Sequence, residues 1–299
     1  MVTVDAGDLF FKVPRPASNA RAVADRKADL FIKAYNDFQY DAFNVGINDL
    51  ALGADFIKAR EANAEFPFLS GTVMDSDGEL LFDPYTVISR GGQKIGIVGV
   101  TTGNEHVDDF TYADVVEAAK QYQSELADKT DYLILLASVF NVDANKLQNA
   151  DLGYDLIIRS HTSRFSRNAQ KTSGGFYMST GKQGKYIQLV TFHQEDPKEP
   201  FVDISRKKQR LDFIKHRLRS YRDQAGDQSL EEAFGDKKQT LAFIQNMQEQ
   251  QGELQNEIKE VSNYIAVQVQ SLNPDVPDDE KWLKEVQEFN QYSQTVRNQ

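Results

Sequence analysis

Apolar positions in the first two thirds of the chain alternate between short runs and helical spacing. Short runs rich in Val, Ile, Leu and Tyr predict strands, whereas apolar residues three or four apart predict helices. Strands are expected at residues 2–4, 42–45, 80–89, 94–100, 132–137, 155–159 and 185–192, with helices at 20–38, 48–60, 113–126 and 142–148. Gly91 and Gly92 predict a hairpin turn. Strands that alternate with helices indicate an α/β sheet.

The pattern changes at residues 196–200, where the run DPKEP indicates a linker. Beyond it, apolar residues follow helical spacing almost throughout. From Ile244 to Leu272 they recur three and four residues apart, which is typical of a coiled coil or a long helical hairpin. We therefore expect one continuous helix over residues 245–272 and a shorter one over residues 278–297.

The apolar seam of this long helix needs a cover, because each large side chain left in water costs roughly 1.5–3 kcal/mol. One candidate is the stripe Leu211, Ile214, Leu218 and Tyr221, folded back antiparallel. The other is a second copy of the chain. The first stripe is shorter than the seam, so the pattern favours dimerisation through the uncovered remainder. The basic residues of the first helix are expected to pair with the acidic residues of the second.

The composition of the chain excludes several classes of function. The 299 residues carry a net charge of −11, which argues against general nucleic-acid binding, and they include no cysteine. Disulfides, thiol catalysis and Cys-ligated zinc are therefore excluded. No apolar run is long enough for a membrane span. The lack of cysteine fits a periplasmic or otherwise extracytoplasmic protein. No signal peptide is visible, and we expect the chain to be a fragment of a longer precursor.

Several segments, in order, resemble the 5'-nucleotidase branch of the calcineurin-like metallophosphoesterases. The first has the form of a strand followed by Gly-Asp, and a later one has the form of a strand followed by a motif with His161. The segments are VDAGDLFF at 4–11, YDAFNVGIND at 40–49, FPFLS at 66–70, PY at 84–85, GQKIGIVGVTT at 92–102, YDLIIRSHTS at 154–163 and GKQGKY at 181–186.

The resemblance implies an α/β sandwich of the metallophosphoesterase type at residues 1–195, followed by an all-helical coiled-coil region at residues 201–299. The first motif of that family, Asp-x-His on a strand, would precede Met1. We therefore expect the first strand of the sandwich to be missing, and the strand at residues 2–4 to lack a neighbour on one side.

The resemblance also implies a site for two divalent metals, which activate a hydroxide and polarise a phosphoryl group. Asp8 and His161 keep ligand types of that site, and Asn48 with Asp49 stand at its catalytic pair. Arg159 replaces a glycine and is a candidate anion-binding group. Other ligand positions fall on residues that do not bind metal well, namely Ile47, Ser138 and Ser163.

Three functions remain open from the sequence. The first is a non-catalytic descendant that binds a ligand or a partner through the old cleft and the coiled coil. The second is a phosphoester hydrolase of the 5'-nucleotidase kind, retooled or completed by residues upstream of Met1. The third is an assembly protein in which the coiled coil acts and the α/β domain is a scaffold. We expect no cofactor, or at most one weakly bound divalent metal.

Overall fold

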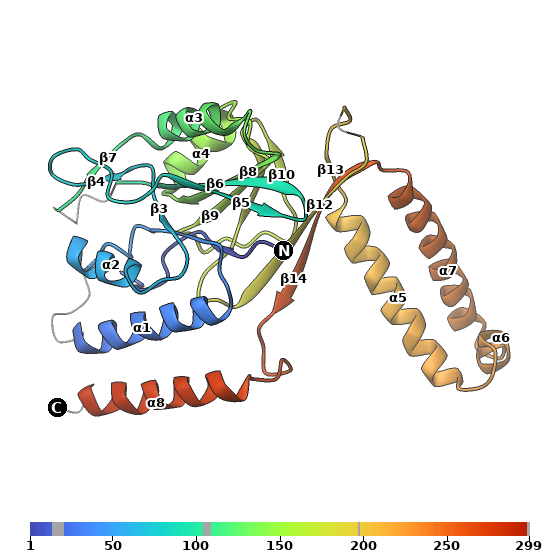
Figure 1. The fold of residues 1–299 in the computed structure, drawn as a ribbon. Helices are drawn as coiled ribbons and strands as arrows, with labels where there is room; N and C mark the ends of the chain where they lie inside the picture. The colour runs from blue at the N-terminus through green and yellow to red at the C-terminus, as the bar shows by residue number, and fades with distance from the viewer. Residues whose placement is uncertain (14–20, 104–108, 197, 298–299) are drawn as a thin grey trace. The chain divides into compact units, whose positions relative to one another are not determined.

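The computed structural model describes residues 1–13, 21–103, 109–196 and 198–297 (Figure 1). The chain divides into two compact units. Unit 1 comprises Met1–Ser166, Lys171–Tyr186 and Ser271–Gln299, and unit 2 comprises Arg167–Gln170 and Ile187–Gln270. Within the described ranges, no helix is both long and apolar enough to cross a membrane.

The larger sheet of unit 1 has six strands in the order β10-β11-β9-β8-β6-β5. Its core is parallel, and β5 joins antiparallel to β6. Gly91 and Gly92 form the tight turn between β5 and β6 with φ values of 58° and 82°, which confirms the predicted hairpin turn. The strands are β5 (Tyr85–Arg90), β6 (Gln93–Thr101), β8 (Tyr132–Ser138), β9 (Leu156–Ser160), β10 (Gln170–Thr172) and β11 (Gly175–Ser179).

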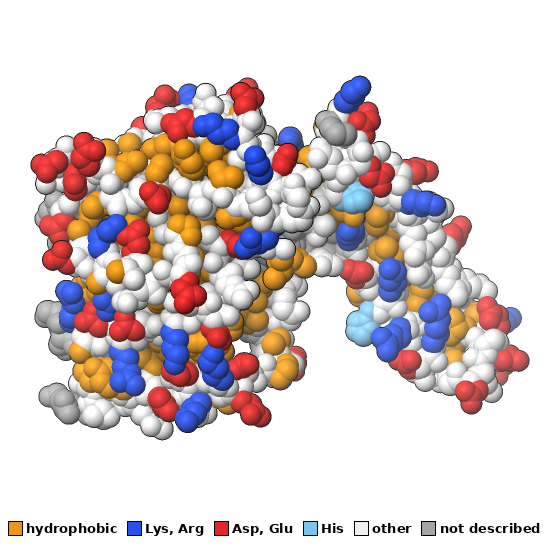
Figure 2. All heavy atoms as spheres, in the orientation of Figure 1, with side chains coloured by type: hydrophobic (Ala, Val, Ile, Leu, Met, Phe, Trp, Pro, Cys, Tyr) orange, Lys and Arg blue, Asp and Glu red, His pale blue; other side chains and the backbone are white. Residues whose placement is uncertain are grey.

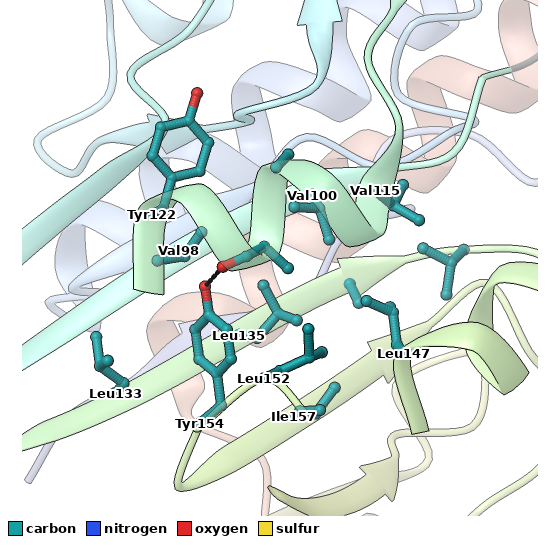
Figure 3. Packing of buried hydrophobic residues seen from close by; sticks show 14 of the residues in the cluster. Val98, Val100, Val115, Tyr122, Leu133, Leu135, Leu147, Leu152, Tyr154 and Ile157 are labelled. Carbon is teal, nitrogen blue, oxygen red and sulfur yellow. Dashed lines mark hydrogen bonds between the residues drawn. The ribbon is translucent and has the colours of Figure 1, made fainter. Parts of the chain in front are cut away.

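Helices α3 (Val115–Leu126) and α4 (Asn141–Asn149) cover one face of this sheet (Figure 1). Asp114 caps α3 by accepting hydrogen bonds from the backbone N–H groups of Val116 and Glu117. The buried layer between helices and sheet is almost wholly apolar (Figure 3). The hydroxyl of Tyr154 donates to the carbonyl of Ala119 at 2.8 Å. This buried polar group is therefore paired.

The opposite face of the large sheet packs on a small parallel sheet with the order β1-β2-β3, and a second apolar cluster joins the small sheet to helices α1 and α2. Unit 1 is thus a sandwich of two sheets between two layers of helices. The elements are β1 (Val4–Asp5), α1 (Arg21–Asp37), β2 (Ala42–Asn44), α2 (Gly53–Glu61) and β3 (Phe68–Leu69), beside the antiparallel pair β4 (Val73–Met74) and β7 (Thr111–Tyr112).

β1 is an edge strand: among the described strands it pairs with β2 alone. This placement agrees with the expected open side of the strand at residues 2–4. A further strand upstream of it stays a prediction.

The C-terminal helix α8 (Glu280–Arg297) packs along α1 in unit 1. Asp37 at the end of α1 accepts hydrogen bonds from Lys281 Nζ at 2.8 Å and Trp282 Nε1 at 3.0 Å. The Trp282 ring lies against Phe38 with centroids 5.4 Å apart. The chain therefore returns to the α/β unit after unit 2 instead of ending in a helical tail.

Unit 2 combines a three-stranded sheet, in the order β12-β14-β13, with a pair of long helices. A capping box on Ser229 begins the short helix that joins the long ones. The elements are β12 (Tyr186–Gln194), β13 (Val202–Asp203), α5 (Ser205–Ala225), α6 (Leu230–Phe234), α7 (Lys238–Lys259) and β14 (Asn263–Ser271).

The expectation of one continuous helix over residues 245–272 is wrong, and the region is not all-helical. α7 ends at Lys259, and Asn263–Ser271 form the central strand of the sheet. Ile265, Val267 and Val269 alternate with Gln268 and Gln270, which is the period of a strand. The helical count matched some of the same apolar residues but ignored this shorter period.

α5 and α7 form an antiparallel hairpin that buries the seam within one chain (Figure 1). Ile214 and Leu218 of α5 pack with Ile244 and Met247 of α7, and Leu254 joins them at the margin. The apolar stripe of α5 therefore packs against this part of the apolar seam of α7. Coiled-coil geometry and dimerisation stay predictions.

Candidate functional site

The candidate site lies in the loops that follow parallel strands. β1 leads into Asp8, β2 leads into residues 45–49, β8 ends at Ser138, and β9 is followed by His161. Loops at the carboxyl ends of parallel strands are the usual place for ligand sites in α/β folds. The Ser160 hydroxyl donates to the Ala6 carbonyl at 2.7 Å and ties the loops of the two sheets together.

Asp8 and His161, which are far apart in the sequence, meet directly. His161 Nδ1 and Asp8 Oδ2 are 2.5 Å apart, and the backbone N–H of Asn48 donates to Asp8 Oδ1 at 2.9 Å. The contact with Asp8 therefore uses Nδ1 of the imidazole and not Nε2. Phe140, 40% exposed, packs edge-on against the imidazole with ring centroids 5.1 Å apart.

Both residues of this pair have left-handed backbone conformations, with φ of 69° at Asp8 and 52° at His161. A non-glycine residue costs about 1–2 kcal/mol there, so the surrounding contacts must hold it. Gly46 allows the close approach, because a Cβ at that position would lie 2.2 Å from the backbone nitrogen of Asp8. The geometry of the pair is thus built into the loops.

Asp49 is fully buried and accepts three backbone hydrogen bonds. The donors are the N–H groups of Asp8 and Phe10, both at 2.8 Å, and of Gly46 at 2.9 Å. Burial, and next the nearby Asp8 carboxylate, raise the pKa of Asp49 well above its usual range, although the three donors oppose this. Asp49 therefore fixes the two loops against each other rather than facing a ligand.

Asn48 does not cap a helix, contrary to the prediction of a helix from residue 48. Residues 48–52 form turns, and α2 begins at Gly53 after Leu52. The Asn48 side chain is 7% exposed and hydrogen-bonds to none of the described residues, while its backbone holds Asp8. Among the described residues, its contact with the Asp8–His161 pair is therefore made by the backbone N–H.

Two of the replaced ligand positions are tied to each other in the interior. The backbone N–H of Ile47 donates to the hydroxyl of Ser138 at 3.1 Å, and both residues are buried. Ser163 is exposed in the loop after His161. The structural roles of Ser138 and Ser160 do not follow from the sequence pattern, although Ser160 stands directly before His161.

Arg159 is 5% exposed, and its guanidinium is used within the fold. Nε and Nη2 donate to the Val139 carbonyl at 3.2 and 3.0 Å, and Nη2 also donates to Asn141 Oδ1 at 2.8 Å. These contacts hold the start of α4 next to β9. Anion binding by Arg159 stays a prediction, and the contacts give the guanidinium a structural role.

The donors present do not fit a pair of divalent metals. The Asp8 carboxylate and the His161 imidazole are bonded to each other, and the Asn48 amide is the third remaining ligand type. Within the described ranges, no three His, Cys, Asp or Glu side chains are grouped so that they could hold a metal ion. A two-metal site requires several carboxylate or imidazole ligands on each ion.

Comparison with known proteins bears out the resemblance to 5'-nucleotidases. A 5'-nucleotidase of Vibrio parahaemolyticus is 30% identical over 205 residues, which cover 66% of this chain and 32% of the relative. Protein UshA of Salmonella pullorum is 31% identical over 153 residues, 48% of this chain and 26% of the relative. The chain spans about a quarter of the length of the first such relatives. No family model matches the sequence.

Solved structures show the same fold. The calcineurin-like phosphoesterase YfkN from Bacillus subtilis matches 99% of this chain and 85% of its own, with a TM-score of 0.64 and 16% identity. The 5'-nucleotidase precursor from Thermus thermophilus matches 65% of this chain and 42% of its own, with a TM-score of 0.55 and 21% identity. The mixed α/β architecture is therefore that of calcineurin-like phosphoesterases.

Proposed function

We propose that this chain, a relative of the 5'-nucleotidases, is a non-catalytic descendant that binds a ligand or a protein partner. The loops at the strand ends are the binding site, and the α5–α7 hairpin is the surface through which the protein associates. The similar proteins include Protein UshA, a 5'-nucleotidase and a 5'-nucleotidase precursor. This similarity supports an extracytoplasmic location.

The bond between Asp8 and His161 carries the proposal. In a metal centre these two side chains would each direct a lone pair at an ion, whereas here a carboxylate oxygen and an imidazole nitrogen lie 2.5 Å apart. The other positions offer Ile47, Ser138 and Ser163, which replace ligands with an apolar or weakly coordinating side chain. Two-metal hydrolysis is not supported by this set of donors.

The same residues offer chemistry for binding. The contact with Asp8 uses Nδ1 of His161 and not Nε2, the Asn48 amide bonds to none of the described residues, and Phe140 presents part of an aromatic ring beside the imidazole. A polar group of a ligand can bond to the imidazole and the amide, and an apolar part can contact the ring. We expect no metal to be needed for this binding.

The test is phosphatase turnover together with metal content. The purified protein is assayed on AMP and on a chromogenic phosphoester with added manganese, and its bound metal is measured by elemental analysis. We expect rates equal to those of Asp8→Asn and less than one metal per chain. Asp128→Asn, an exposed site, is the matched control. Turnover near about one per second that Asp8→Asn abolishes and Asp128→Asn retains would make the chain a hydrolase.

A further inference from the structure

Helix α5 concentrates positive charge on an acidic chain. It carries eight Lys and Arg residues and two Asp residues, a net charge of +6 in a chain of −11, which leaves −17 on the remainder. Figure 2 shows Lys and Arg side chains gathered along the hairpin next to apolar ones. Such a separation of charge favours association between unlike surfaces.

Most of these charges form no ion pair with an acidic residue of the described ranges. Among the described residues, Lys207 is the one cation of α5 with an ion pair, to Glu257 of α7 at 2.9 Å. This corrects the expectation that the basic side chains pair generally with the acidic residues of α7. A helix face whose charges are unpaired keeps them available for a second molecule.

One side of α5 combines arginines with an exposed aromatic ring. Arg206, Arg210, Phe213 and Arg217 follow each other at spacings of four, three and four, so they form one stripe along the helix, here called the arginine stripe. All four are exposed, and Phe213 is 58% exposed. Exposed Arg and aromatic residues together are the composition of protein interfaces, in which Lys is depleted.

α7 extends this surface. Arg210 Nη2 donates to Gln250 Oε1 at 2.9 Å, so Gln250 lies on the same side of the hairpin as the arginine stripe. Phe243 is seven residues before Gln250 and therefore shares its face of α7. Phe243 is 50% exposed. Two aromatic rings thus accompany the arginines on one side of the hairpin.

Unit 1 carries a surface of the opposite chemistry. Asp75, Asp77 and Glu79 lie in one loop, here called the acidic loop, and none of them forms an ion pair with a described residue. Asp75 Oδ1 accepts the backbone N–H groups of Asp77 and Glu79 at 2.9 and 3.0 Å and holds the loop in shape. Leu80 beside it is 39% exposed. Carboxylates with a neighbouring apolar group complement arginines with a neighbouring ring.

We propose that the arginine stripe binds the acidic loop of a second copy of this chain. The inference rests on the proposed associating role of the hairpin and names its partner and its contacts. A nucleic acid or an anionic lipid surface is disfavoured because the −17 on the rest of the chain repels a polyanion, whereas the acidic loop of a second copy offers the stripe a local group of carboxylates beside an apolar side chain. The contact joins two different surfaces. Each copy can therefore bind one neighbour through its arginine stripe and another through its acidic loop.

The experiment is sedimentation velocity on the full chain over a range of concentrations. Wild type is expected to associate at low salt and to dissociate at about 1 M salt, where the Debye length is about 3 Å. The double variant Arg210→Glu/Arg217→Glu, and separately Phe213→Ser, should raise the dissociation constant about tenfold or more. Lys129→Glu/Lys182→Glu has the same change in net charge at exposed sites of unit 1 and should leave it unchanged.

A charge exchange identifies the partner surface. Asp77→Lys/Glu79→Lys should weaken association as the arginine variant does, and a mixture of the two variants should associate again, since each then offers what the other lacks. A monomeric wild type, an arginine variant equal to its control, or a mixture that stays dissociated overturns the inference. Far-UV circular dichroism checks that each variant is folded. A monomer without phosphatase activity would leave the non-catalytic proposal standing.

Discussion

The strand-end loops of unit 1 and the hairpin of unit 2 place polar groups in opposite ways. In the loops, charged and hydroxyl side chains are buried and each is bonded to a backbone group of another element, as with Asp49 and Ser160. In the hairpin, the interior is apolar, the charges face water, and a single ion pair links the two helices in the described chain. The structure of the loops therefore depends on particular residues, whereas the structure of the hairpin depends on the spacing of its apolar residues.

This difference shows that a residue of a motif can have a structural role apart from any role in catalysis. Asp49 stands at a catalytic position by resemblance, yet its carboxylate is fully buried and holds three N–H groups of two loops. Losing it would disorganise the loops whether or not the chain acts on a substrate. The structural role of Asp49 is therefore independent of the residues at Ile47 and Ser163.

Asp49→Ala is expected to have the largest effect on stability. The change leaves three backbone N–H groups in the interior without an acceptor, and each such group costs about 1–3 kcal/mol before relaxation. We expect a loss on the order of 3 kcal/mol or more in the free energy of unfolding, measured by urea titration followed by circular dichroism.

Asp128→Ala is the control for this variant, because Asp128 is exposed and should change stability by about 0.5 kcal/mol or less. If Asp49→Ala costs no more than Asp128→Ala, the loops do not depend on the buried carboxylate, and the contrast with the hairpin disappears.

In the hairpin, substitution of two adjacent residues by alanine should have very different effects on the free energy of unfolding. Ile244 is fully buried in the seam, and Ile244→Ala should cost about 2–4 kcal/mol. Phe243 is 50% exposed, and Phe243→Ala should cost about 0.5 kcal/mol or less. Hydrogen exchange of the α5 and α7 amides measures both, because it reports the local opening of the hairpin. Equal protection in the two variants would mean that the seam does not hold the helices together.

The sequence was informative where a single period ran through a whole element. The helix predicted at residues 113–126 is α3, and the strands predicted at residues 94–100 and 132–137 are β6 and β8. The meeting of Asp8 with His161 follows from the resemblance, since no periodicity relates residues so far apart. What the motif could not reveal is that the two side chains bond to each other.

The prediction of secondary structure was wrong or incomplete where a helical and a strand period overlapped, or where a strand was very short. At residues 263–271 the alternation of Val and Gln overrode the helical spacing, because the strand is paired in the centre of a sheet. The two-residue strands β3, β4, β7 and β13 have too few residues for any period to show. The helix predicted from residue 48 starts at Gly53, and the backbone N–H of Asn48 is bonded to Asp8 instead.

The smallest effect we predict concerns the docking of α8, and the single tryptophan of the chain reports it. Hydrogen bonds from Lys281 and then from Trp282 lower the pKa of Asp37 below its usual value. A carboxyl whose pKa is lowered in the folded state stabilises that state above its ordinary pKa of about 4 and loses the contribution as the pH falls through the lowered value. Trp282 emission should therefore be constant from neutral pH to about pH 4 and shift to longer wavelength below it.

Asp37→Asn should shift the emission already at neutral pH, because the amide no longer pairs with Lys281. Glu288→Gln, an exposed change on the same helix, should behave as wild type. An emission spectrum that Asp37→Asn leaves unchanged at every pH would show that the ring contacts with Phe38 hold α8 without the carboxylate.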